Sequence, residues 1–125
     1  METPRTCVKA NDVIGVKVKN TANESLGKIE EIILDKNKGC ARYVILSFGG
    51  FLGMGEKWFA LPWKALNYDI SNDCFILNID KEKLKNAPGL DKDHMPNWAD
   101  EKWGLTIYQY YGTAPYWQDK NQPHV

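Results

Sequence analysis

Short runs of β-branched and aromatic residues, separated by turn-forming residues, constrain the fold more than any other feature of the sequence. They occupy residues 13–19, 26–34, 41–48, 57–63, 65–70 and 74–79. Several of these runs alternate apolar with polar residues, which is the period of a half-buried strand. Six short strands at regular spacing are typical of a small barrel or sandwich. A chain of 125 residues has room for one such domain with a single core.

The individual runs predict where each strand faces. In 13–19 the apolar set is Ile14, Val16 and Val18. In 26–34 the alternation slips at Glu30 and Glu31, so we predict a β-bulge there that returns the residues after it, Ile32 and Leu34, to the inner face. The run 41–48 is apolar on both faces, which indicates a central strand. The polar residues 36–39 between these two runs predict a hairpin turn.

The later runs predict two further strands and a short helix. We expect Leu66, Tyr68 and Ile70 on the inner face of one strand. The next strand should place its own alternating apolar residues inward, namely Phe75, Leu77 and Ile79. Asp80 then predicts the N-cap of a helix over 80–85. Between the third and fourth runs, the glycine-rich residues 49–55 predict a loop, with its apolar side chains capping the core. No helix follows to complete a phosphate site.

The C-terminal part of the chain is rich in large aromatic side chains. Seven tyrosines and tryptophans lie within 98–117, a density that is typical of a packed segment and opposite to that of a disordered one. We predict two turns of helix over 105–111, ended by Gly112, with Leu105, Tyr108 and Tyr111 on one face. We expect this segment to complete the core and to form much of a homodimer contact. The candidate interface residues are Trp98, Trp103, Tyr108, Tyr111, Tyr116 and Trp117.

Charge and cysteine content narrow the class of function. Lysine plus arginine and aspartate plus glutamate each number 16, so the chain lacks the field that draws proteins to nucleic acid. No stretch approaches the roughly 20 apolar residues that cross a bilayer. The three cysteines have wide, irregular spacing that fits free thiols better than a zinc site or a disulfide framework. We therefore expect a cytoplasmic protein with no membrane insertion, no bound nucleic acid, no cofactor and no metal.

An enzymatic or metal-binding alternative rests on one polar segment. Asp91, Asp93 and His94 are close in sequence, and carboxylate and imidazole groups can bind a divalent metal or a small molecule. Such close spacing needs further donors to complete a site, and no nucleophile and base pair is evident in the sequence. A solvated loop is the better interpretation. We therefore expect no catalytic residues and a protein that is not an enzyme.

A resemblance to a known family comes from several motifs. The stretch VILSFGGFLGMGEKWFALPW at 44–63 strongly resembles the PRC-barrel family, and its glycine-rich run ending in Pro-Trp is the most specific part. VIG at 13–15, LGKIE at 26–30, ILD at 33–35, YYG at 110–112 and YW at 116–117 are also similar to that family.

The resemblance implies a mainly β fold in the form of a small and strongly bent barrel. The residue patterns add short helices to it, one of them in the aromatic tail. It also implies an adaptor that engages other proteins, as in the cytoplasmic domain of the photosynthetic reaction-centre H subunit and in a ribosome maturation factor. Neither of their partners transfers to this chain, and the family supplies no catalytic residues. We expect a barrel core over 11–88 and an extension over 89–125, packed on the barrel or on a second subunit.

Overall fold

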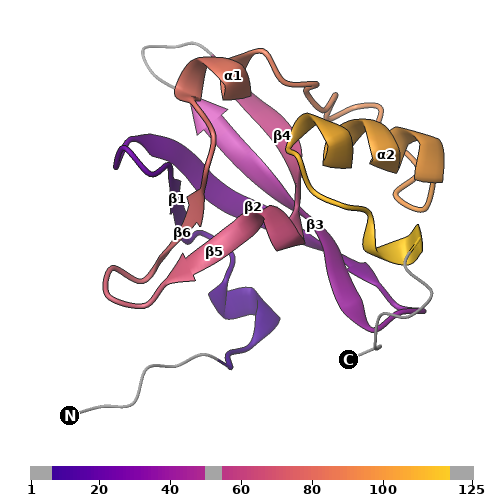
Figure 1. Ribbon diagram of the computed structural model, residues 1–125, viewed down its shortest axis with the longest axis horizontal. Helices are drawn as coiled ribbons and strands as arrows, with labels where there is room; N and C mark the ends of the chain where they lie inside the picture. The colour runs from indigo at the N-terminus through magenta and orange to yellow at the C-terminus, as the bar shows by residue number, and fades with distance from the viewer. Residues whose placement is uncertain (1–6, 50–54, 119–125) are drawn as a thin grey trace.

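A mixed sheet of six strands, in the order β4-β3-β2-β1-β6-β5, forms the body of the protein in a computed structural model that describes residues 7–49 and 55–118. Neighbouring strands pair antiparallel except β1 and β6, which are parallel. The sheet bends strongly without closing, so the predicted mainly β, barrel-like fold is confirmed (Figure 1). The strands are β1 (Lys17–Lys19), β2 (Ser25–Asp35), β3 (Cys40–Gly49), β4 (Glu56–Pro62), β5 (Leu66–Asp69) and β6 (Cys74–Leu77).

Within the described ranges, two α-helices and three 3₁₀ turns accompany the sheet. Helix α1 spans Lys81–Lys85 and α2 spans Glu101–Tyr110, while the 3₁₀ turns are Ala10–Asp12, Trp63–Ala65 and Tyr116–Gln118. In Figure 1 the orange and yellow C-terminal part, including α2, lies to one side of the sheet, beside β3 and β4. The part of the chain that the structure describes contains no helix long and apolar enough to cross a membrane.

The β2–β3 hairpin confirms two predictions. Residues 36–39 form the turn, and the Asp35 carboxylate accepts hydrogen bonds from the backbone N–H groups of Asn37 and Lys38. The β2–β3 register shifts between Ile29 and Glu31, at the predicted bulge. Because of this shift, Ile29 and Ile32 pack in the same apolar cluster.

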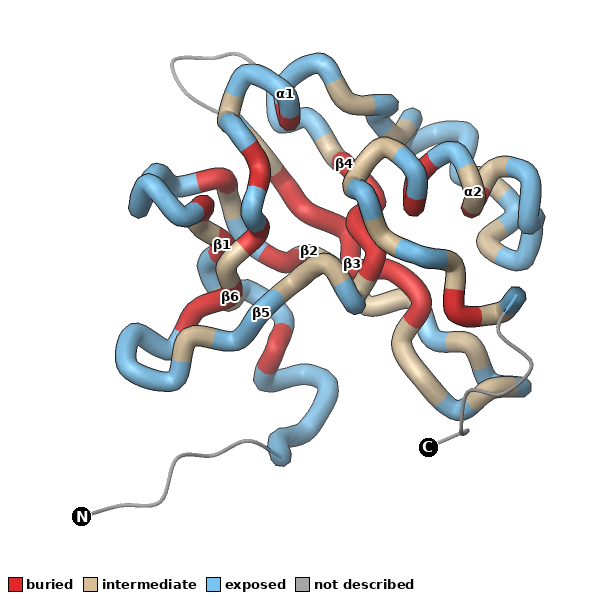
Figure 2. Tube along the Cα trace, in the orientation of Figure 1, coloured by how far each residue is buried: buried red, intermediate tan, exposed pale blue. Residues whose placement is uncertain are grey.

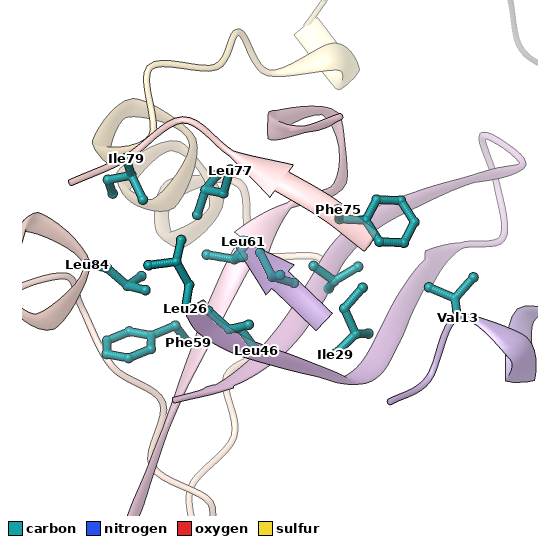
Figure 3. Packing of buried hydrophobic residues seen from close by; sticks show 12 residues of the cluster. Val13, Leu26, Ile29, Leu46, Phe59, Leu61, Phe75, Leu77, Ile79 and Leu84 are labelled. Atoms are coloured by element: carbon teal, nitrogen blue, oxygen red, sulfur yellow. The ribbon is translucent and has the colours of Figure 1, made fainter. Parts of the chain in front are cut away.

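The barrel core lies within the bend of the sheet, against α1. Figure 3 shows side chains from β2, β4, β6 and α1 pointing toward one another. Figure 2 shows that many of the buried residues lie along β3 and β4. The predicted inward set of the last strand is buried, as is the helix residue Leu84. The buried members of this cluster are Val13, Val18, Leu26, Ile29, Val44, Leu46, Phe59, Leu61, Phe75, Leu77, Ile79 and Leu84.

The first predicted strand is shorter than expected. Only Lys17–Lys19 pairs as a strand, and Val13 is buried while Ile14 is 36% exposed. The reason is local: the 3₁₀ turn ends just before Val13, and Gly15 adopts a φ of +87°, which is incompatible with an extended strand. The prediction that Ile14 faces inward is therefore wrong.

Three other apolar residues predicted to face inward are exposed instead. Leu34 is 61% exposed, because a second register shift in β2 lies between Ile33 and Leu34. Tyr68 is 38% exposed, because β5 is at the edge of the sheet and pairs only with β6 among the described strands. Ile70 is 53% exposed, because it lies in the turn that follows β5. An edge strand has less protein to cover its side chains than a central one.

Helix boundaries and caps also differ in part from the predictions. Asp80 is the N-cap residue of α1, but its side chain makes no capping hydrogen bond. Helix α2 begins at Glu101, one turn before the predicted start at residue 105. The apolar residues of the predicted glycine-rich loop fall within 50–54 and lie outside the described residues.

Candidate functional site

A second cluster of buried side chains lies on the outer face of β3 and β4, separate from the barrel core. We call it the aromatic layer. The sheet contributes Tyr43 and Ile45 from β3 and Ala60 from β4, all at most 1% exposed. The extension beyond α1 supplies the cover, so β3 and β4 are buried on both faces. The residues from the extension are Leu90, Trp98, Trp103, Ile107, Tyr108, Tyr111, Tyr116 and Trp117.

Helix α2 is held at both ends by local hydrogen bonds. The Asp100 carboxylate accepts from the backbone N–H groups of Lys102 and Trp103, which satisfies two free donors at the N-terminus. At the C-terminus, Gly112 has a φ of +67°, and Thr113 N–H donates to the Tyr108 carbonyl at 2.9 Å, which is the Schellman arrangement. The predicted helix stop at Gly112 is therefore confirmed.

The buried face of α2 is different from the predicted one. It consists of Gly104, Ile107 and Tyr108, while Leu105 and Tyr111 are half-buried. Gly104 allows the helix to approach the sheet closely, because a Cβ atom there would lie 2.6 Å from the Tyr43 hydroxyl oxygen and 3.1 Å from Trp117 Cη2. Helix α2 therefore contacts the sheet most closely at a residue that has no side chain.

The aromatic rings form one connected network with Tyr43 near its centre. The Tyr43 ring lies 5.2 Å from Trp103 and 5.8 Å from Tyr108, both edge-on, and 6.0 Å from Trp98. The two indoles lie 5.6 Å from each other, and Trp117 lies 4.8 Å from Tyr108. Edge-to-face pairs at these distances stabilise by about 0.5–1.5 kcal/mol each beyond their buried area.

A charged corner joins the network to the hairpin turn. The Arg42 guanidinium lies over the Trp117 ring, with Cζ 3.9 Å from the centroid, and its Nη1 is 3.6 Å from Asp35 Oδ2. Tyr116 donates a short hydrogen bond to the same carboxylate oxygen. Burial alone would raise the pKa of the Asp35 carboxyl, but the bonds from Tyr116 and from two backbone N–H groups outweigh it and lower the pKa below its usual value.

Tyrosine hydroxyls in the layer stay protonated at any physiological pH. Burial raises the pKa values of Tyr108, Tyr111 and Tyr116, and the Asp35 carboxylate adds to the effect at Tyr116. The hydroxyls of Tyr108 and Tyr116 act as hydrogen-bond donors, to the Arg42 carbonyl and to the Asp35 carboxylate. Five buried polar atoms have no hydrogen-bond partner among the described residues: Arg42 Nε, Arg42 Nη2, Tyr43 Oη, Tyr111 Oη and Trp117 Nε1.

All six residues predicted as an interface belong to this layer. Tyr108 and Tyr116 are buried, at 0% and 7% exposure, and contact the sheet or its hairpin turn within the same chain. The other four residues are half-buried: Trp98, Trp103, Tyr111 and Trp117. A homodimer contact through them stays a prediction.

The sequence reasoning missed Arg42 and Tyr43, although the two-faced apolar pattern of 41–48 indicated that something covers this strand.

The alternative segment does not gather a catalytic set. Asp91, Asp93 and His94 are all exposed, and His94 Nδ1 lies 2.9 Å from Asp91 Oδ2. Across 7–49 and 55–118 there is no group of three or more His, Cys, Asp or Glu that could hold a metal ion. Of the three cysteines, which are all free, Cys74 is buried and Cys40 half-buried, within β6 and β3.

Comparison with known proteins identifies the family. The family model described as the PRC-barrel domain matches residues 7–84. The chain belongs to the PRC-barrel family. No curated protein matches it.

One solved structure that matches part of this chain is the crystal structure of a 16S ribosomal RNA processing protein, RimM, from Pseudomonas aeruginosa. It shares 15% sequence identity with this chain at a TM-score of 0.41. The match covers 65% of this chain and 48% of that protein, so it spans about half the length of that relative. The family match ends within α1, so α2 and the rest of the aromatic extension lie outside it.

Proposed function

We propose that this PRC-barrel protein is a non-catalytic cytoplasmic module that assembles with another protein through the exposed side of its aromatic layer. The observation that carries the proposal is the pair of indoles Trp98 and Trp103. Both rest on the fully buried ring of Tyr43 and both remain partly open to solvent. Large aromatic side chains on a rigid support bind partners with little loss of conformational freedom.

The surroundings of these indoles resemble the rim of a protein interface. Trp58 is half-buried in the same layer, and the ammonium of Lys92 lies 4.5 Å from its ring centroid. Charged residues at the start of α2, Asp100 and Glu101, are exposed. Aromatic residues at the centre and charged residues around them are typical of protein–protein contacts. Membership of the PRC-barrel family supports the same function, because the resemblance implies an adaptor.

The proposal is tested with a variant that blocks the surface and leaves the layer intact. Ala99 is exposed between Trp98 and the N-cap Asp100, so Ala99→Arg places a long charged side chain beside the indoles without removing a packed ring. Ser71→Arg adds the same charge at the exposed turn between β5 and β6 and serves as the matched control.

Affinity capture from the native cells, quantified by mass spectrometry, should then identify a partner that the parent and Ser71→Arg retain and that the Ala99→Arg variant loses. Binding should be repeated with the purified partner. Equal recovery of every captured protein by all three proteins would contradict the proposal.

Besides the aromatic layer, the open edge of β5 is a second surface, at which a copy of this chain could pair. The outer edge of β4 is bridged by Leu90, whereas β5 leaves its outer edge unpaired among the described strands and exposes Tyr68 and Ile70 next to it. Open edge strands invite pairing with another chain. Sedimentation velocity over a concentration series should show a dimer that Tyr68→Lys weakens. A monomer at every concentration would exclude a homodimer.

A further inference from the structure

Two lysines face each other across the first strand pair, in an arrangement that the fold itself does not favour. Lys17 in β1 and Lys28 in β2 are register partners, so their side chains share one face of the sheet. Like charges directly opposite each other destabilise a sheet. Lys28 has one distant carboxylate, with Nζ 3.9 Å from Glu30 Oε1, and Lys17 has no ion-pair partner among the described residues.

The pair belongs to a longer row that crosses the sheet. Lys28 is in turn the register partner of Ser47 in β3, and Ser47 is the partner of Trp58 in β4. The row therefore runs from two lysines, past a serine, to an indole at the border of the aromatic layer. The basic end of the row and the aromatic layer occupy the same outer face of the sheet.

A groove of about 380 Å³ lies over the basic end of this row. Along the groove, the backbones of β2 and β3 lie so close that a Cβ atom at Gly27 would be only 1.9 Å from the Ser47 carbonyl oxygen. The groove is lined by Lys17, Lys19, Ser25, Gly27, Lys28, Ser47, Gly49 and Glu56. Its lining therefore includes three lysines and one acidic residue, in a chain whose formal net charge is zero.

The one acidic side chain of the groove is already engaged from outside it. Glu56 Oε2 accepts a hydrogen bond of 3.3 Å from Trp58 Nε1 and lies 4.0 Å from Lys92 Nζ. Lys92 is not among the residues that line the groove. Because Lys92 offsets the charge of Glu56, the groove keeps an excess of positive charge.

We propose that this groove binds the carboxylates of an extended acidic peptide segment, which belongs to the protein partner of the aromatic layer. The inference rests on the proposed function for the identity of that segment. In an extended peptide, every second side chain lies on the same face, about 6.5–7 Å from the previous one. Lys17 and Lys19 are also two residues apart in a strand, so their spacing matches that of alternate peptide side chains. Nucleic acid is disfavoured because the chain has no net positive charge and no arginine lines the groove.

The test uses the full chain and a fluorescein-labelled short peptide in which Glu and Gly alternate. Fluorescence anisotropy should show binding that weakens when salt is raised from about 50 mM to about 300 mM. The same peptide with Gln in place of Glu should not bind. The double variant Lys17→Gln with Lys28→Gln should weaken binding of the Glu peptide by about tenfold or more. Lys36→Gln with Lys102→Gln removes the same charge at two exposed positions outside the groove and should bind as the parent does.

A thermal melt separates lost binding from lost folding. Since Lys17 and Lys28 repel each other, their replacement should leave a melting temperature no lower than that of the parent. Four results would each overturn the inference: no binding of the Glu peptide by the parent, equal binding of the Gln peptide, equal binding by the groove variant, or tighter binding of a labelled single-stranded RNA of matched charge.

The Ala99→Arg variant distinguishes this inference from the proposed function. It leaves the groove unchanged and should bind the Glu peptide as the parent does. If the peptide does not bind but Ala99→Arg still loses a cellular partner, only the groove inference fails. If the peptide binds through the lysines but no partner depends on Ala99, only the proposed function fails.

Discussion

The hydroxyl of Tyr108 donates a hydrogen bond of 2.7 Å to the backbone carbonyl of Arg42, a residue 66 positions earlier in the chain. Both residues are buried, so this bond ties α2 to a central strand in a place that solvent does not reach. It also orients the Tyr108 ring edge-on to Tyr43. The aromatic extension is thus attached to the barrel by a specific polar contact as well as by apolar packing.

Replacing Tyr108 with Phe should destabilise the protein by about 1–2 kcal/mol, because the buried Arg42 carbonyl loses its hydroxyl donor. Urea unfolding followed by tryptophan fluorescence measures the change. Tyr110→Phe is the matched control, since its hydroxyl donates to the Lys83 carbonyl in an exposed position. That control should change stability by less than about 0.5 kcal/mol, and an equal loss in both variants would contradict the role given to Tyr108.

Replacing Gly104 with Ala should destabilise the protein by about 1–3 kcal/mol, although the same change stabilises most exposed helices. The added methyl group would meet the Tyr43 hydroxyl at 2.6 Å. Combining it with Tyr43→Phe should recover part of the loss, because the hydroxyl that blocks the methyl group has no hydrogen-bond partner among the described residues. A double-mutant cycle by urea unfolding should give a coupling of about 0.5 kcal/mol or more, whereas strict additivity would place the strain elsewhere.

The presence and approximate position of the strands were predictable, because they depend on local sequence patterns. The bulge at Glu30 and the hairpin at 36–39 follow from a slip in alternation and from turn-forming residues, which act within a few positions. The exposure of Leu34 and Tyr68 was not predictable in this way. It depends on a second register shift and on which strand ends the sheet, and alternation carries no information on either.

The aromatic layer was predictable in composition but not in arrangement. The density of rings in 98–117 indicated a packed segment, and the two apolar faces of 41–48 indicated a covered strand. Their pairing through Tyr43, Arg42 and Gly104 is a long-range contact between separate segments. In sequence alone, a glycine such as Gly104 only lowers the predicted helix propensity. Its role in close packing becomes evident once the opposing side chain, Tyr43, is known.

Replacing Asp35 with Asn should make stability less dependent on acid pH. The pKa of Asp35 is lower in the folded protein than the value of about 3.9 expected when unfolded, so its charge stabilises the fold above that value. This contribution is lost as the pH falls through the folded pKa. The parent should be more stable than Asp35→Asn by about 1–3 kcal/mol near neutral pH, and this gap should narrow as the pH falls from about 5 toward the folded pKa.

Urea unfolding at a series of pH values measures that gap. Asp93→Asn removes an exposed carboxylate outside the cluster and is the control for general charge effects. A gap between the parent and Asp35→Asn that stays constant across this range would show that ionisation of Asp35 does not stabilise the fold.

Removing the chain after Pro88 should lower the melting temperature sharply or make the protein insoluble, and should weaken any dimer. The truncation uncovers Tyr43, Ile45 and Ala60, which are at most 1% exposed in the whole chain. Differential scanning fluorimetry and sedimentation velocity measure the two effects. A truncated protein with the melting temperature and size of the parent would show that the extension is a passive appendage.

The cause of that instability can be tested in the truncated protein itself. Tyr43→Thr with Ile45→Thr would give β3 a polar outer face, as in antiparallel sheets that have one face in water, while Val44 and Leu46 still pack in the barrel core. If the exposed apolar face is what the extension protects, the truncated double variant should regain solubility. The same two changes in the full chain should be destabilising, because there they remove packing against Trp103 and Tyr108. Opposite effects of one pair of substitutions in the two backgrounds would show that the extension and the outer face of β3 stabilise each other.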